Sequence, residues 1–176
     1  MIDEKRKKEA SGNFSQYLRE GLIQKQKDEE ARKMYIQNSH ISLELAGRML
    51  DDPLKPYLWV IVTSYYSMFY MANAVLLHLG YKTGSKIVHK VTSDALIVLV
   101  LDKLKKGMLE QYEITRDDAL EIASIKSEEL LRNYELELGK RSRFQYNMTL
   151  EIQEQMARTS VKRAVEFLLE MENLMH

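Results

Sequence analysis

The chain has 176 residues, with 26 basic (Lys and Arg) and 26 acidic (Asp and Glu) side chains, so its formal net charge is zero. Such a chain has no global field to attract nucleic acid or anionic lipid, and any nucleic-acid role must rest on a local basic patch. The absence of cysteine excludes disulfides, cysteine-ligated zinc and thiol catalysis, and it fits a cytoplasmic protein. Two prolines and seven glycines leave little turn material, which favours long helices.

Residues 1–12 are dense in charged side chains, so we expect a loose N-terminus followed by one folded domain over residues 13–176. Asn13 is a candidate N-cap, and helical periodicity runs from it to Asp51 with a possible division into two helices. Pro53 ends this element, because the residue before a proline resists the helical conformation.

The segment from Tyr57 to Leu77 has 21 residues and no charge. It is long enough to cross roughly 30 Å of hydrocarbon, so a membrane span is one interpretation. Serine, threonine and asparagine side chains lie within it, and its tyrosines sit at the middle rather than at the ends, where a spanning helix prefers them. We therefore expect the central helix of a bundle, with Gly80 as its left-handed cap and no membrane partner.

Three further helices are predicted, over residues 86–106 with Ser85 as cap, from Thr115 to about residue 138, and from a Thr149 cap to about residue 174. No segment of useful length alternates with the period of a strand. Short connections make consecutive helices antiparallel neighbours. The sequence therefore predicts an all-α fold, an antiparallel up-and-down bundle of four to five helices.

None of the four histidines lies in a metal-binding spacing, and the glycines form no phosphate loop, so we expect no metal and no cofactor. Two groups of residues remain as candidates for function. The first is a tyrosine-rich helical face, which either packs in the core or touches a ligand. Its members are Tyr65, Tyr66, Phe69 and Tyr70.

The second group is a short basic segment between two predicted helices. Arginine forks suit phosphate oxygens, and a tyrosine ring suits a base. The alternative is a solvated loop whose arginines pair with Glu135 or Glu137. The candidate ligand-binding residues are Lys140, Arg141, Arg143, Tyr146 and Asn147.

These two groups resemble the HEPN family (higher eukaryote and prokaryote nucleotide-binding domains). Its members carry an aromatic helix of the form A-Y-Y-A-M-F-H-A-A-x-A-L-L, and residues 64–77 here read SYYSMFYMANAVLL. Gly80-Tyr81, then Ser85 and His89, continue the pattern. Further on, the family has R-x4-6-H or an Arg-then-Tyr form. The segment RSRFQY, residues 141–146, is similar to the latter.

The resemblance covers roughly residues 29–175 and implies an antiparallel helical bundle, often dimeric. It implies binding of nucleotide or RNA phosphate, RNA cleavage as in toxin-like members of toxin–antitoxin pairs, or partnership with a nucleotidyltransferase-type protein. The motif histidine is missing, and Tyr146 stands in its place. An unperturbed tyrosine has a pKa near 10, which makes it a poor base at neutral pH.

We therefore expect binding of nucleotide or RNA phosphate without strong catalysis. The alternative is a metal-independent ribonuclease, with Arg141, Tyr146 and His89 as its catalytic candidates. A membrane-associated or structural helical protein is a further alternative. We also expect a homodimer, because long helices with many apolar positions leave an apolar face uncovered.

Overall fold

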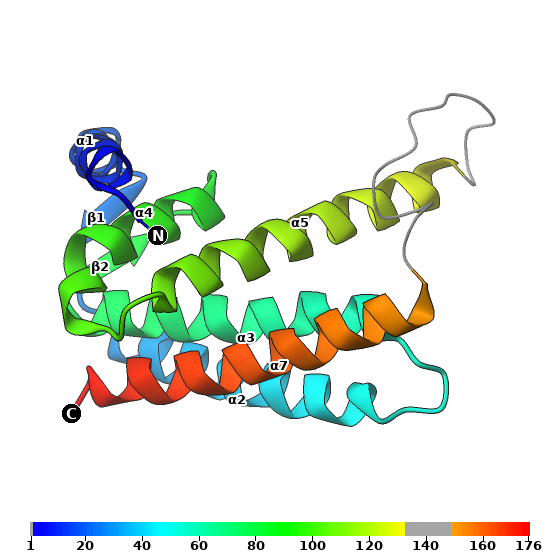
Figure 1. Ribbon diagram of the computed structural model, residues 1–176. Coiled ribbons are helices and arrows are strands. Elements are labelled where there is room, and N and C mark those ends of the chain that lie inside the picture. Colours follow the sequence, from blue (N-terminus) through cyan, green and yellow to red (C-terminus); the bar gives the residue numbers. More distant parts are fainter. Residues whose placement is uncertain (1, 133–148) are drawn as a thin grey trace.

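The computed structural model describes residues 2–132 and 149–176, and it confirms the all-α bundle. The bundle consists of α2 (Glu29–Leu50), α3 (Tyr57–His78), α5 (Met108–Arg132) and α7 (Leu150–Asn173). Figure 1 shows α2 and α5 running one way and α3 and α7 the other, as predicted for an up-and-down arrangement. The helix α3 packs on each of the other three, so it is the centre of the bundle.

The uncharged run forms α3, and it is buried in the bundle. Sixteen of its 22 residues are buried, including Tyr65, Met68 and Phe69. The helix is long and apolar enough to cross a membrane, but 83% of its most apolar window is covered by protein. A helix that is apolar on all sides needs neighbours on all sides. Here α2, α5 and α7 supply them.

The N-terminal segment is a helix, so the prediction of a loose end over residues 1–12 is wrong. The helix α1 (Glu4–Glu20) begins at an Asp3 cap, whose side chain accepts the Arg6 backbone N–H at 2.7 Å. Three positions at helical spacing are buried on its inner side: Ala10, Phe14 and Tyr17. Their burial outweighs the poor helix propensity of Ser11 and Gly12 in its middle.

A short antiparallel pair of strands from distant parts of the chain joins α1 to the bundle, although the sequence predicts none. Strand β1 (Ile23–Lys25) pairs antiparallel with β2 (Tyr81–Thr83), with Gln24 opposite Lys82. Gly84 donates its N–H to the Leu22 carbonyl at 2.8 Å, and a Cβ at this glycine would lie 3.3 Å from that oxygen. Strands of three residues are too short for a period of two to be visible in the sequence.

The third helix starts later than predicted and is not capped by Ser85. The helix α4 (Val88–Val100) follows Ile87, which is the N-cap residue and has a positive φ of 44°. A β-branched side chain in the left-handed region is an outlier that the surroundings must hold in place. A short 3-10 turn, η1 (Leu101–Lys103), ends the element.

The last two helices differ in how well their starts are predicted. The helix α5 begins at Met108 rather than at Thr115, whose hydroxyl donates to the Gln111 carbonyl inside the helix. Thr149 does cap α7, accepting the Ile152 N–H at 3.4 Å.

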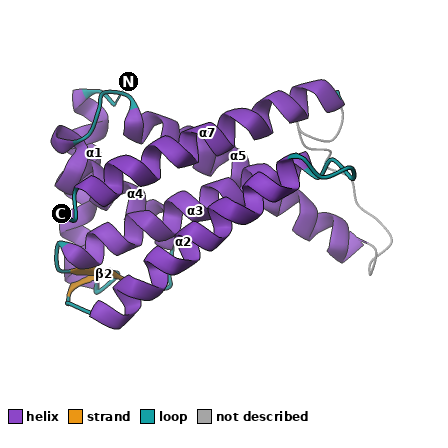
Figure 2. Ribbon diagram, turned by 90° about the horizontal axis from the view of Figure 1, so that it is seen from below, coloured by secondary structure: helices purple, strands orange, loops and turns teal. Residues whose placement is uncertain are grey.

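The helices α1 and α4 gather with the β strands at one end of the bundle, as Figures 1 and 2 show.

Candidate functional site

The structure describes only one of the two candidate groups that the sequence predicts. The basic segment that holds Lys140, Arg141, Arg143, Tyr146 and Asn147 lies outside the described residues. The tyrosine-rich face lies on α3 and is divided. Tyr65 and Phe69 are buried, whereas Tyr66 and Tyr70 are half-buried. The face therefore packs partly in the core and partly toward solvent.

His89, a catalytic candidate from the sequence, lies against this face. Its ring centroid is 4.7 Å from that of Phe69, 5.5 Å from that of Tyr65 and 6.0 Å from that of Tyr66. The Tyr65 hydroxyl and the His89 Nδ1 atom form a hydrogen bond of 2.7 Å. Tyr65 has no exposed surface, so this bond fixes the plane of the imidazole from inside the protein.

The same histidine lines an open cavity of about 570 Å³ between α1, α4 and α5. This volume falls in the range of small-molecule sites. The cavity is lined by Arg6, Glu9, Ile87, His89, Lys90, Glu113, Arg116, Asp117 and Leu120. Its lining mixes three cations, three carboxylates, an imidazole and two apolar side chains.

Burial, and then the positive charge of Arg116, lower the pKa of His89 below its usual value. The usual value is near 6.5, so the imidazole is neutral at pH 7. Burial raises the pKa of the Tyr65 phenol, which therefore keeps its proton. A neutral imidazole bonded to a neutral phenol can either accept or donate a proton at its outer nitrogen, according to its tautomer.

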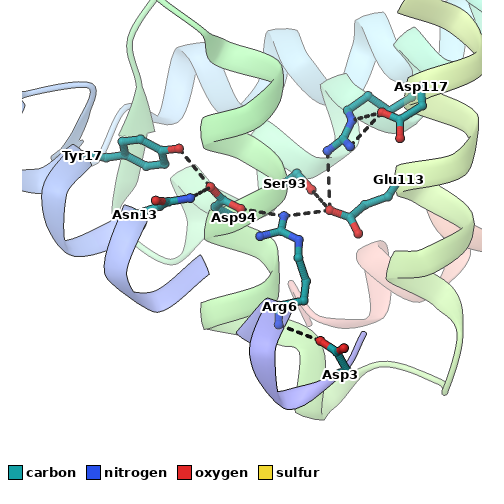
Figure 3. Close-up of polar contacts among 9 residues, drawn as sticks. Asp3, Arg6, Asn13, Tyr17, Ser93, Asp94, Glu113 and Asp117 are labelled. Carbon is teal, nitrogen blue, oxygen red and sulfur yellow. Dashed lines mark hydrogen bonds and ion pairs between the residues drawn. The ribbon is translucent and has the colours of Figure 1, made fainter. Parts of the chain in front are cut away.

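The helix α1 is attached to this site by a buried carboxylate on α4. Asp94 has no exposed surface, and its partners among the described residues all come from α1: the Arg6 guanidinium at 2.6 Å, the Asn13 amide at 2.9 Å and the Tyr17 hydroxyl at 2.9 Å. Figure 3 shows these side chains converging on Asp94. A buried carboxylate needs such partners, because an uncompensated charge in the interior is costly.

A second carboxylate, Glu113 on α5, connects the two arginines of the cavity. One of its oxygens, Oε1, lies 2.8 Å from an Arg6 nitrogen and 3.6 Å from an Arg116 nitrogen. The Ser93 hydroxyl donates to the same oxygen at 2.8 Å. Arg116 also pairs with Asp117 at 2.8 Å. Figure 3 shows Glu113 beside Arg6 and Ser93, and its contacts with Arg6 and Arg116 hold both arginines in place at the cavity wall.

The N-terminus of α4 also faces this region, through His89 and Lys90. No side chain in the described part of the chain caps this helix. Uncapped N–H groups and the helix dipole favour an anion at such an end. Lys90 is exposed, and it has no ion-pair partner among the described residues. Among the described residues of its lining, the cavity thus has one cation without an ion-pair partner and two arginines that are already paired.

Comparison of the chain with protein-family models, with curated proteins and with solved structures gives no match in any of the three. No group of three or more metal-ligating side chains occurs among the described residues.

Among the lining residues, the sequence singles out only His89 as a functional candidate. The prediction misses Arg6 and Glu9 because they belong to the segment expected to be loose. Asp94 does leave a signal. It is the one charge in the stretch VTSDALIVLV, residues 91–100, where a buried acid demands a partner.

Proposed function

We propose that this protein binds a ribonucleotide unit, either a free nucleotide or a nucleotide within RNA, in the cavity between α1, α4 and α5. The observation that carries this proposal is the composition of the cavity wall, which offers a partner to each part of a ribonucleotide. Lys90, Arg116 and the α4 N-terminus suit a phosphate. Carboxylates such as Asp117 suit ribose hydroxyls. Ile87 and Leu120 give an apolar surface for a base.

Titration of fluorescently labelled nucleotides and short RNAs into the protein tests this proposal. Lys90→Ala should weaken binding about fivefold to tenfold, because it removes the lining cation that has no ion-pair partner among the described residues. Lys162→Ala on α7 is the matched control, since Lys162 is also exposed but lies outside the cavity lining. Equal affinities for the wild type and Lys90→Ala would contradict the proposed site.

The basic segment is tested with the same ligands. An Arg141→Ala, Arg143→Ala double variant that binds less tightly would show that this segment contributes to binding. Loss of affinity in the double variant alone, with Lys90→Ala unaffected, would move the site away from the cavity.

A second candidate function is metal-independent cleavage of RNA, and the position of His89 favours it. In the tautomer in which Nδ1–H donates to Tyr65, the Nε2 lone pair is free to take the proton of a ribose 2′-hydroxyl. The 2′ oxygen would then attack phosphorus, and the bond from phosphorus to the 5′ oxygen would break. The leaving oxygen takes a proton from solvent, and the product is a 2′,3′-cyclic phosphate. Arg116 would stabilise the charge on the phosphoryl group.

RNA incubated with the protein in EDTA tests this second candidate. Cleavage should fall at least a hundredfold in His89→Gln and persist in His78→Gln, which changes an exposed histidine at the end of α3. Intact RNA after incubation with the wild type would exclude it.

Two partners implied by the family resemblance are also proposals. A second copy would cover the exposed apolar side chains of α2, which are Met34, Ile41 and Leu45. Binding of a nucleotidyltransferase-type protein is tested by co-purification of this chain with the product of a neighbouring gene.

A further inference from the structure

We infer that the cavity selects a phosphodiester, which carries one negative charge, over phosphate groups of higher charge, and that Glu113 sets this limit. The inference rests on the proposed binding of a ribonucleotide unit and specifies the kind of phosphate that is bound. A diester occurs both in an RNA strand and in a cyclic nucleotide. The shared chemistry is a phosphate with two ester bonds and a single charge.

The described residues around the cavity carry no excess of positive charge before any ligand binds. The described lining has three cations, Arg6, Lys90 and Arg116, and three carboxylates, Glu9, Glu113 and Asp117. His89 adds no charge at neutral pH, and Asp94 lies directly behind Arg6. Arg6 and Arg116 are already paired with carboxylates, so among the described cations of the lining Lys90 is the one that can pair with an added anion, and it matches the single charge of a diester. A terminal phosphate adds about one and a half to two negative charges at pH 7, and a diphosphate adds more.

Glu113 dominates among the three carboxylates because of its position. Its side chain is 18% exposed, whereas that of Asp117 is 68% exposed, and Glu9 is also exposed. A buried charge is screened less by water and salt than an exposed one. Since Glu113 also lies between Arg6 and Arg116, any phosphate that reaches both guanidiniums comes close to its carboxylate.

Both arginines keep a partner when the charge of Glu113 is removed. Arg6 still has Asp94 at 2.6 Å, and Arg116 still has Asp117 at 2.8 Å. Glu113→Gln therefore changes the charge of the cavity by one unit while the guanidiniums stay anchored. The repulsion that it relieves is larger for a doubly charged ligand than for a singly charged one.

Isothermal titration with four adenine ligands tests the inference. The ligands are the dinucleotide ApA, 3′,5′-cyclic AMP, 5′-AMP and ADP. For the wild type we expect at least one diester, ApA or cyclic AMP, to bind more tightly than AMP, and AMP more tightly than ADP. The comparison of ApA with cyclic AMP shows whether the diester comes from an RNA strand or from a cyclic nucleotide.

Glu113→Gln should shift the affinity ratio of AMP to the preferred diester about tenfold in favour of AMP. Asp117→Asn should shift it the same way by about threefold, because that carboxylate is better screened. Glu121 is an exposed residue on α5, one turn beyond Asp117 and outside the cavity lining. Glu121→Gln removes the same charge there and should leave the ratio unchanged.

The possible failures can be told apart. If AMP or ADP binds the wild type more tightly than both diesters, or if the ratio is unchanged in Glu113→Gln, the inference is wrong and the proposed function stands. If none of the four ligands binds, the proposed function is wrong and the inference falls with it. If Glu113→Gln does not fold, Asp117→Asn decides, and an unchanged ratio in that variant overturns the inference.

Discussion

Replacement of the buried carboxylate on α4 should loosen α1 before it affects the rest of the bundle. In Asp94→Asn the amide oxygen still accepts bonds from Asn13 and Tyr17, but the charged contact with Arg6 at 2.6 Å is lost. Removing one partner of a buried ion pair costs about 3–5 kcal/mol when the other charge is left uncompensated. Arg6 retains Glu113 at 2.8 Å, so we expect a loss of about 2 kcal/mol in the docking free energy of α1.

Amide hydrogen exchange measures this loss helix by helix. Because α1 packs mainly on α4 and β1, it can detach from them while the bundle stays intact. A loss of about 2 kcal/mol corresponds to exchange roughly thirtyfold faster in residues 4–20, with little change in α3. Tyr17→Phe removes one neutral donor to the same carboxylate, so it should cost about 1.5 kcal/mol, the low end of the range for a hydrogen bond to a charged group.

Asp102→Asn in the exposed turn η1 is the matched control, and it should change exchange in α1 by less than threefold. The reasoning would be refuted if Asp94→Asn left the exchange of α1 unchanged, or if α3 lost as much protection as α1.

The remaining predictions concern the core, the histidine and the apolar surface. Phe167→Ala should lower the free energy of unfolding by about 3–5 kcal/mol in urea titrations, because Phe167 has no exposed surface and stacks on Tyr112 at 5.2 Å; a loss below 1 kcal/mol would contradict this packing. The pKa of His89 is lowered in the folded state, so its contribution to stability is lost as the pH falls below about 6.5. Urea titrations between pH 7 and pH 5 should therefore show a steeper fall for the wild type than for His89→Gln, by at most about 1.4 kcal/mol per pH unit, and equal slopes would count against a buried neutral imidazole. Ile41→Lys with Leu45→Glu should turn the expected dimer into a monomer by light scattering, whereas a monomeric wild type would remove the proposal of a dimer.

The sequence predicts the bundle well because its strongest signals come from burial. An uncharged run as long as Tyr57 to Leu77 has few places to lie in a single domain, and the proline after Asp52 leaves little choice for the end of α2. The Thr149 cap succeeds for a similar reason, since a threonine before a long amphipathic segment has a local partner, the Ile152 N–H.

The site is harder to predict because its contacts join residues far apart in the chain. Arg6 meets Asp94 and Glu113 across more than eighty residues, and no local pattern records that pairing. The same holds for His89, which reaches its place against Tyr65 only after α4 turns back over α3. The prediction of a helix start at Thr115 is wrong because a threonine can also lie inside a helix. Its hydroxyl then donates to a carbonyl four residues earlier, here that of Gln111.

The attachment of α1 matters for anyone who wishes to trim this protein for crystallisation or fusion. A fragment that starts at Asn13, where the sequence alone places the domain boundary, would lack Arg6 and the bond from the Ile2 N–H to Glu110. Among the described residues, it would leave the Asp94 carboxylate with the two neutral donors Asn13 and Tyr17 and without its Arg6 partner. Such a fragment is expected to precipitate, or the rest of α1 is expected to detach from α4, although the sequence predicts only a loose terminus for the omitted residues.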